Sequence, residues 1–323
     1  MTDTPARPAS PPARLRHRTA DPLETVIAAQ DGLVTRAQAL AHGLSTDQVD
    51  RRLAARRWVP VHPCVYRHAD HPPGERARVR AAVLWAGQGA VLSGAAAVWW
   101  WGLGDAAPAV VTVTVPRRRA PRPRAGVVVR RRDLDPADVG AHDGLALARP
   151  AAAVLEAAAD PSVAADALLD RVLADRSGRA PTAAELARAH ARSLGAHGSA
   201  AVGRLLAGAS RRLAARTRHA LRALLTGGGV RGWRTDVVVA GVPLDLAFPA
   251  ARLCVEVPVG AGPATGDGCG GAWRHAVLRR NGWRTVVVEP AELRRPDDVL
   301  ARLREALTGL PAGPGGSAVR AAG

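Results

Sequence analysis

The sequence predicts a multidomain α+β protein with three folded parts. In the first part, capped helices are followed by a stretch in which valines alternate with prolines. The middle part combines valine-rich strands with a long alanine-rich helical segment, and the last runs in the order helix, strands, helix, strand, helix. Because 323 residues are enough for two or three hydrophobic cores, each part is expected to have its own core.

The charge composition indicates a polyanionic partner. The chain has 45 Lys and Arg residues against 28 Asp and Glu residues, a net charge of +17, and all 45 are arginine. The absence of lysine excludes a P-loop lysine and Schiff-base chemistry. The arginine surplus favours nucleic acid as the partner, and the alternative is a basic surface that binds polyanions only weakly.

Cysteine spacing and hydropathy indicate the compartment. The three cysteines are too widely spaced for a disulfide framework or a CxxC motif. The longest apolar stretch, residues 90–104, is shorter than the ~20 residues that a membrane helix needs. Residues 1–20, rich in proline and arginine, and residues 309–323 are expected to be disordered tails. The sequence therefore predicts a cytoplasmic protein with reduced thiols and no membrane partner.

Residues 21–70 predict three short helices and a small β-hairpin. Apolar residues recur at helical spacing from Leu23 onwards. Thr35 and Ser45 are each followed three residues later by glutamine, which is the pattern of a helix capping box. Valines alternate with turn prolines after Trp58, which indicates two strands. Helices joined by a tight turn and followed by such a wing form a winged helix-turn-helix.

In such a module the helix that begins after Ser45 enters the major groove of DNA. Gln48 and Arg51 carry donors that suit base edges, and the neighbouring arginines suit phosphate oxygens. The alternative is a solvated arginine face on an ordinary helical module. The DNA-binding residues predicted from the sequence are Gln48, Arg51, Arg52, Arg56, Arg57 and Arg67.

Residues 32–66, GLVTRAQALAHGLSTDQVDRRLAARRWVPVHPCVY, resemble the N-terminal domain of AbiEi-type antitoxins from type IV toxin–antitoxin systems. The resemblance implies a winged helix that binds operator DNA and represses its own operon, and a partner toxin of the nucleotidyltransferase type. A protein that neutralises a toxin by contact is a further alternative. Cys64 stands where the family pattern has glycine, and its Cβ brings the turn of the wing into question.

Residues 75–207 are expected to form a mixed α/β middle domain. Helices are predicted at about 75–86 and 93–101, and strands at 110–115 and 126–132, before an alanine-rich helical segment. The loop between the strands, PRRRAPRPRA, suits a phosphate backbone or is a solvated hairpin loop. This region also resembles the middle of the antitoxin-like proteins, and it carries no catalytic motif.

Residues 210–308 predict an α/β sandwich around a mixed sheet. A hairpin centred between Ala250 and Ala251 would set Asp245 directly opposite Glu256 and leave the other face of the pair apolar. Opposed Cβ atoms lie only ~4.5–5.5 Å apart. Two carboxylates that close repel each other unless a cation such as Mg²⁺ bridges them or they point apart into water.

The same residues resemble the Vsr-like domain of the PD-(D/E)XK nuclease superfamily, which implies a restriction-endonuclease-like fold. Asp245 and Glu256 match two acids that hold Mg²⁺ in that family. Pro258 stands in the place of a water-activating residue, and Arg216 and Arg218 stand where the leading helix would carry glutamate. These departures imply a degenerate nuclease domain that binds nucleic acid or mediates a homodimer.

The sequence therefore predicts a DNA-binding, antitoxin-like transcriptional regulator whose partners are double-stranded DNA and a nucleotidyltransferase-type toxin. The alternative is an active Mg²⁺-dependent endonuclease with Asp245 and Glu256 as its catalytic and metal-binding residues. In that case Asp267, in the loop that follows, would supply the missing group.

Overall fold

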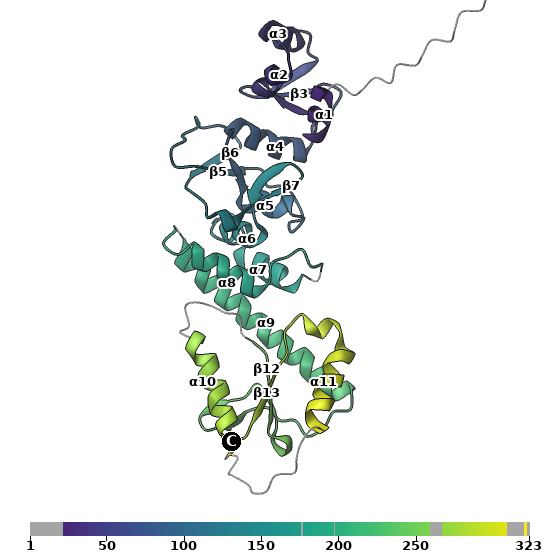
Figure 1. Cartoon of the computed structure of the whole chain (residues 1–323), viewed down its shortest axis with the longest axis vertical. Helices are drawn as coiled ribbons and strands as arrows, with labels where there is room; N and C mark the ends of the chain where they lie inside the picture. The colour runs from purple at the N-terminus through teal and green to yellow at the C-terminus, as the bar shows by residue number, and fades with distance from the viewer. Residues whose placement is uncertain (1–21, 176, 197, 259–266, 309–319, 322–323) are drawn as a thin grey trace, which may run out of the picture. The chain divides into compact units, whose positions relative to one another are not determined.

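The structure is a computed structural model that describes residues 22–175, 177–196, 198–258, 267–308 and 320–321. It confirms the predicted mixture of helices and sheets, and the described residues form four separate sheets (Figure 1). The chain divides into two compact units, Met1–Gly87 and Gln88–Gly323. The predicted tail at residues 1–20 lies outside the described residues.

The first unit combines four helices with a three-stranded antiparallel sheet in the order β1-β3-β2. Its core contains Ile27, Val49 and Trp58, all of them buried. The elements, in chain order, are α1 (Pro22–Ala29), β1 (Leu33–Thr35), α2 (Arg36–Ala41), α3 (Thr46–Ala54), β2 (Trp58–His62), β3 (Val65–His68) and α4 (Glu75–Ala86).

Both capping boxes predicted from the sequence are confirmed. The Thr35 hydroxyl accepts the Gln38 backbone N–H, and the Gln38 side chain accepts the Thr35 backbone N–H. Ser45 and Gln48 make the same two contacts at the start of α3. These reciprocal bonds satisfy N–H groups that have no partner within the helix, so they fix where α2 and α3 begin.

The turn between β2 and β3 forms with Cys64 in left-handed backbone, at a φ of 59°. The Cys64 carbonyl accepts the Arg36 backbone N–H at 2.8 Å, which joins the turn to the start of α2. The glycine in the family pattern is explained by this conformation, because glycine adopts it without strain. Cys64 adopts it nonetheless, so the departure does not prevent the hairpin.

Helix α4 packs with the first unit, whereas the sequence analysis placed residues 75–86 in the middle domain. Ala77 and Ala81 contact the core residues Leu33 and Val65. The Nε atom of Arg80, whose side chain is 2% exposed, lies 2.6 Å from Asp31, in the turn after α1. A contact between residues so distant in sequence leaves no periodic pattern in the sequence. The sequence analysis therefore began the middle domain at residue 75, whereas the first compact unit extends to Gly87.

The second unit begins with a five-stranded sheet in the order β6-β5-β4-β8-β7. The helices at Gly94–Trp100 and Pro150–Ala158 pack on its strands, and the long α9 (Ser199–Gly227) packs with the helices that follow them. The strands are β4 (Val91–Ser93), β5 (Val111–Val115), β6 (Val127–Arg131), β7 (Val139–His142) and β8 (Leu145–Ala148). The other helices of this part are α5 (Gly94–Trp100), a 3-10 turn (Pro136–Asp138), α6 (Pro150–Ala158), α7 (Ala165–Ala174) and α8 (Ala183–Arg192).

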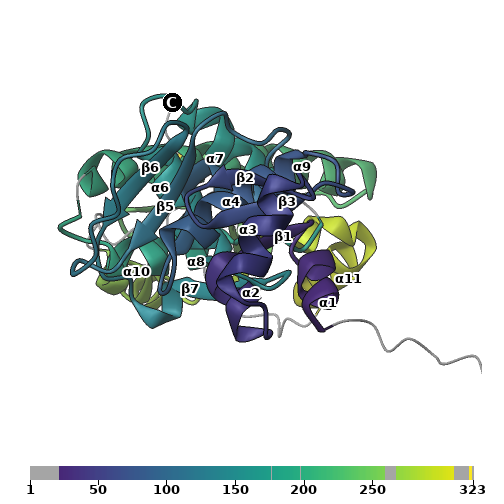
Figure 2. The same ribbon diagram turned by 90° about the horizontal axis from the view of Figure 1, so that it is seen from above.

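Strands β5 and β6 lie side by side and are parallel (Figures 1 and 2), so the expected hairpin between them is wrong. Val113 pairs with Val129, and the register continues to Val115 and Arg131. A parallel pair requires the chain to return to the starting end of the sheet. The proline- and arginine-rich segment 116–126 makes this return without a helix.

Helix α9 is continuous across the boundary predicted between the middle and C-terminal domains. Its first half packs with α7 and α8, and its second half buries Ala214, Leu221 and Leu225 in the core of the C-terminal part. The helix carries many arginines. Within the described ranges no helix, α9 included, is both long and apolar enough to cross a membrane.

The C-terminal part has a mixed sheet between helical layers, as predicted. Strand β12 pairs antiparallel with β11 and parallel with β13. Leu253 and Val255 face α9 and α11, whereas Cys254 faces Leu278 of α10. The elements are β9 (Val237–Val239), β10 (Val242–Pro243), β11 (Leu246–Phe248), a 3-10 turn (Pro249–Ala251), β12 (Leu253–Glu256), α10 (Asp267–Arg280), β13 (Arg284–Val287), a 3-10 turn (Glu292–Arg294) and α11 (Pro296–Thr308).

Part of the predicted C-terminal tail, residues 309–323, is ordered as strand. Strand β14 (Arg320–Ala321) pairs antiparallel with β9 and forms the edge of a small sheet in the order β10-β9-β14. The expectation of a wholly disordered tail is therefore wrong at these two residues. The remainder of that tail lies outside the described residues.

The contact between Asp31 and Arg80 predicts a specific loss of stability. Asp31→Asn keeps the left-handed backbone that Asn tolerates but removes the charge opposite the buried guanidinium. We expect the free energy of opening of residues 22–86 to fall by about 2 kcal/mol. Hydrogen exchange of the full-length protein measures this value for each peptide.

The matched control is Asp70→Asn, because the Asp70 side chain is 89% exposed and its only charged contact is His68 at 3.8 Å. This variant should change the free energy of opening by no more than about 0.5 kcal/mol. Equal exchange in α4 of the Asp31→Asn variant and the unchanged protein would show that α4 does not depend on this pair.

Candidate functional site

Helix α3 presents an arginine-bearing face to solvent. Val49, with no exposed surface, is the residue by which the helix enters the core, and Leu53 is half-buried. Arg51 is exposed, and so are Arg56 and Arg57, which directly follow the helix. Ser45 therefore begins a helix at the surface, which is the placement that the sequence analysis required for contact with a duplex.

Arg52 differs from these three arginines because its side chain contacts both an aromatic ring and a backbone carbonyl of the protein. Its guanidinium carbon lies 5.6 Å from the centre of the Trp58 ring. Its Nη1 also donates to the Gln48 carbonyl at 3.2 Å. The side chain is half-buried, so Arg52 contributes to the packing of α3 on the wing as well as to the surface charge.

Two other predicted DNA-binding residues are committed to the protein's own backbone. The Gln48 side-chain oxygen accepts the Ser45 N–H at 2.8 Å, which leaves only its amide N–H groups for a base edge. Arg67 donates to the backbone carbonyls of His68 and His71 at the end of the hairpin. Contact of these two side chains with DNA stays a prediction, and the capping and turn roles are what the geometry shows.

An ion pair that the sequence did not indicate sets the position of α3 against α2. Arg36 donates from Nη1 and Nη2 to the two carboxylate oxygens of Asp50, at 2.8 and 3.2 Å. The hydrogen bonds from Arg36 lower the pKa of Asp50. A two-point contact of this kind fixes orientation as well as distance, so the surface arginines of α3 are held by a second contact besides the core.

A second group of cations lies in segment 116–126 of the other unit. Arg118, Arg122 and Arg124 are exposed there. Arg119 instead donates to the Gln88 carbonyl at 2.5 Å, which ties the segment to the start of β4. Arg117 is exposed too, so the segment combines one anchored arginine with four that face solvent, as its arginine and proline content suggested.

The register predicted for the hairpin is confirmed in β11 and β12. Leu246 pairs with Val255 and Phe248 with Leu253. Continuing the same register by one residue sets Asp245 opposite Glu256, at the end of β11 and β12. The apolar face of the hairpin packs against α9 and α11, as the alternation of the two strands indicated.

Each carboxylate is paired with cations of the protein itself. Arg218 of α9 donates to Asp245 Oδ1 at 2.8 Å, and the Val257 backbone N–H donates to Asp245 Oδ2 at 3.1 Å. On α10, Arg274 Nη2 lies 3.4 Å from Glu256 Oε1, and His275 Nε2 lies 2.7 Å from Glu256 Oε2. The repulsion that would favour a metal ion is therefore relieved by side chains from two helices.

The carboxylate pair does not fit a Mg²⁺ site as it stands. Mg²⁺ requires several oxygen ligands in octahedral geometry, and both Asp245 and Glu256 already accept bonds from guanidinium groups. In the part of the chain that the structure describes, no group of three or more His, Cys, Asp or Glu side chains could hold a metal ion. The Asp267 side chain lies outside the described residues.

Cys254, between the two acids in the sheet, is not a reactive thiol. Burial first, and then the nearby Glu256 and Asp245 charges, raise the pKa of Cys254 to about 12. A thiol with so high a pKa carries almost no thiolate near neutral pH, and thiolate is the nucleophile and metal ligand. The side chain has no exposed surface and belongs to the core under α10.

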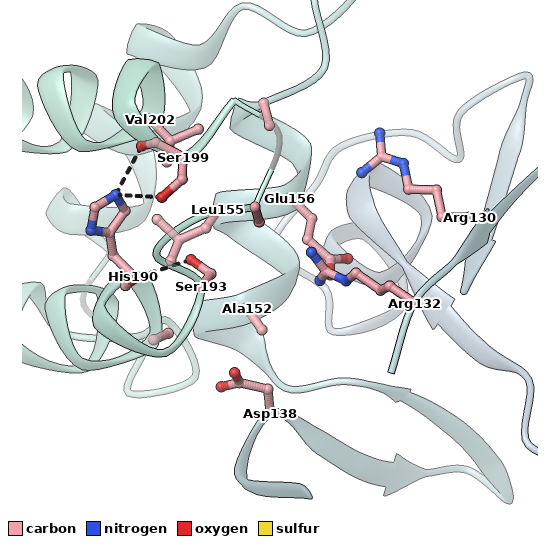
Figure 3. A pocket seen from close by; sticks show the side chains of 13 residues that line it. Arg130, Arg132, Asp138, Ala152, Leu155, Glu156, His190, Ser193, Ser199 and Val202 are labelled. Carbon is pink, nitrogen blue, oxygen red and sulfur yellow. Dashed lines mark hydrogen bonds and ion pairs between the residues drawn. The ribbon is translucent and has the colours of Figure 1, made fainter. Parts of the chain in front are cut away.

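A small polar cavity lies between the five-stranded sheet and helices α6, α8 and α9 (Figure 3). Glu156 is 7% exposed, pairs with Arg132 and accepts the Gly94 backbone N–H at 3.1 Å. Burial raises the pKa of Glu156, and the Arg132 charge acts in the opposite direction. His190 is held through Nε2 by the Ser199 carbonyl at 2.9 Å.

The volume of this cavity is about 60 Å³. Sites for small molecules usually measure about 300–1,000 Å³, and a water molecule takes about 30 Å³ in the liquid. The cavity therefore suits one or two water molecules rather than a nucleotide or a metabolite. Its charged residues join β6, α5 and α6, so we interpret it as part of the structure of this domain.

Comparison with known protein families gives one match. Residues 89–208 match the family model of the AbiEi antitoxin C-terminal domain. This range runs from the start of the five-stranded sheet into α9, so it covers the middle region, where the sequence resemblance was weaker. The match does not cover the N-terminal segment or the carboxylate pair. No curated protein matches the chain.

The contact between Arg218 and Asp245 predicts a measurable coupling. Arg218→Ala leaves one oxygen of a half-buried carboxylate without its partner, so we expect a loss of about 1–2 kcal/mol in the free energy of unfolding. Asp245→Asn in addition should recover part of that loss, because the unpaired charge is removed while an acceptor for Val257 remains.

Arg222→Ala is the matched control for this cycle. Arg222 is exposed one turn further along α9 and bonds only to the Arg218 carbonyl. Urea denaturation of the unchanged protein, Arg218→Ala, Asp245→Asn and the double variant gives the coupling energy. Additive losses in the double variant would show that the two side chains contribute independently, against the geometry described above.

Proposed function

We propose that the chain is a DNA-binding, antitoxin-like transcriptional regulator. The observation that carries the proposal is the capped helix α3, with Arg51, Arg56 and Arg57 at the surface of a unit that precedes an AbiEi antitoxin domain. The order of its elements, three helices followed by a two-strand hairpin, supports a winged helix-turn-helix. The partners inferred from this reading are double-stranded DNA and a nucleotidyltransferase-type toxin.

The electrostatics support a duplex as the ligand. The formal net charge of +17 attracts a polyanion from any direction, and it does not by itself select a sequence. Selection requires side chains at the base edges. Of the two arginines in α3, Arg51 in the second turn makes fewer contacts with the protein, because within the described residues its side chain donates only to the Asp47 carbonyl. We therefore assign base contact to Arg51 first and phosphate contact to Arg56 and Arg57.

For the C-terminal part, we infer a nuclease-like fold that does not cleave. Arg218 forms an ion pair with Asp245, Arg274 forms one with Glu256, and His275 contacts the second oxygen of Glu256, which supports a pair of acids that is not free to hold a metal ion. Pro258 lacks any group that could activate water. The pair then acts as the attachment point of α9 and α10 on the sheet.

The regulator proposal is tested with the double variant Arg51→Ala/Arg57→Ala. Both side chains are exposed, so the fold should be unaffected. We expect affinity for the DNA upstream of the chain's own gene to fall at least tenfold, and the slope of log affinity against log salt to fall by about 1–2. Fluorescence anisotropy with labelled duplex at several salt concentrations measures both.

Arg188→Ala/Arg204→Ala serves as the control, because it removes two exposed arginines from α8 and α9 and so changes the net charge equally. Its affinity for the upstream duplex should stay within about twofold of the unchanged protein. The proposal is wrong if the unchanged protein binds upstream and random duplexes equally well at every salt concentration.

The endonuclease alternative makes the opposite claim about the carboxylate pair. We expect no nicking of supercoiled plasmid with Mg²⁺ or Mn²⁺ over a wide range of protein concentration, and no rise in melting temperature with either ion. Nicking that requires the metal and disappears in Asp245→Asn would establish the alternative, because that change removes a metal ligand while keeping the residue's size.

A further inference from the structure

Trp273 on α10 is exposed to an unusual degree for its type. The side chain is 57% exposed, the highest value for any tryptophan among the described residues. Tryptophan is normally well buried on average because of its large apolar area. A half-exposed indole on a regular helix is therefore available as a contact for another molecule.

The helix geometry shows that this exposure follows from the way α10 packs. Leu278 has no exposed surface and joins the core formed by Val242, Cys254 and Trp283. At 3.6 residues per turn, Trp273 lies about 140° around the helix axis from Leu278, well away from the buried face. The same rule sets Arg280 within about 20° of Trp273, two turns further along.

The charges around Trp273 are of one sign. Arg274 and His275 turn toward the sheet and contact Glu256. Glu256 is the acidic side chain that contacts the described part of α10, and it lies on the side of the sheet. Arg279 and Arg280 in the last turn are exposed, and no described carboxylate pairs with either. The exposed surface of residues 272–280 thus combines one aromatic plane with two guanidinium groups, Arg280 on the side of Trp273 and Arg279 about 120° around the helix axis from it.

We propose that this face of α10 binds single-stranded nucleic acid, with a base stacked on Trp273 and phosphates on Arg279 and Arg280. Stacking on an aromatic side chain requires an unpaired base, because the faces of bases in a duplex are already covered. Arg280 lies two turns from the indole on the same side of the helix, and Arg279 precedes it at the edge of that side, so the pair suits phosphates of the adjoining nucleotides. This surface is separate from the arginines of α3 and does not depend on the proposed regulator function.

The carboxylate pair explains why such a surface binds without cutting. Arg274 pairs with Glu256, and His275 contacts its second oxygen, so the carboxylate on the inner side of this helix already has partners within the protein. The same contacts hold α10 against the sheet. The helix therefore presents the indole from a fixed support.

The test uses the full-length protein and a short fluorescein-labelled single-stranded DNA of mixed sequence. We expect Trp273→Ala to weaken binding about tenfold and Trp273→Phe to keep most of the affinity, since stacking on an aromatic ring is worth about 1–3 kcal/mol per base. Arg279→Ala/Arg280→Ala should lower the salt slope by about 1. Both exchanges are at exposed positions and leave the core unchanged.

The Trp273→Ala exchange is also made in the Arg51→Ala/Arg57→Ala variant, in which duplex binding through α3 is removed. The loss of single-strand affinity caused by Trp273→Ala should be the same in that variant. Loss of operator binding with an intact Trp273 effect separates the two proposals. Unchanged single-strand affinity in Trp273→Ala overturns the inference. If the same variant instead alters the mass of the protein in solution, the face is an interface between copies of the chain, and the nucleic-acid assignment is wrong.

Discussion

Pairing between guanidinium and carboxylate groups is the constraint on which the arrangement of this protein depends. Charged groups are costly to bury unless a partner is present, and this chain has 28 acids for 45 arginines. Three buried or half-buried acids each pair with an arginine: Asp31 with Arg80, Glu156 with Arg132 and Asp245 with Arg218. The remaining arginines have to face solvent, which gives the surface its positive charge.

These pairs occur where one structural element meets another. Asp31 joins α4 to the turn after α1, and Asp50 joins α3 to α2. Glu156 connects α6 with the strand that ends before Arg132, and Asp245 connects the hairpin with α9. In each case a charge-assisted contact sets orientation that apolar packing alone would leave less defined. The arginines proposed to meet DNA are supported by the same kind of interaction that removes the carboxylates from metal binding.

Local features could be read from the sequence, and long-range ones could not. The capping boxes at Thr35 and Ser45 and the register of the β11–β12 hairpin depend on residues close together in the sequence, and both predictions are confirmed. The parallel pairing of β5 with β6 depends on the path of the chain in three dimensions, and the sequence pattern is the same for a hairpin.

The same distinction applies to the candidate site. Arg218 departs from the nuclease pattern, but its contact with Asp245 joins residues 27 positions apart and has no local signature in the sequence. The contacts of the two α10 side chains with Glu256 have no local signature in the sequence either. Sequence reasoning thus identified the acids and their alignment and could not identify what neutralises them, because pairing depends on how helices pack on a sheet.

The continuity of α9 has a consequence for how this protein's parts were joined. The antitoxin match ends at residue 208, inside a helix that continues to Gly227 and contributes Leu221 and Leu225 to a different core. Each residue added to a helix rotates everything after it by about 100°. A single residue inserted between the two cores would turn both leucines away from their sheet. The number of residues in this part of α9 is therefore fixed by the direction in which the two leucines must point.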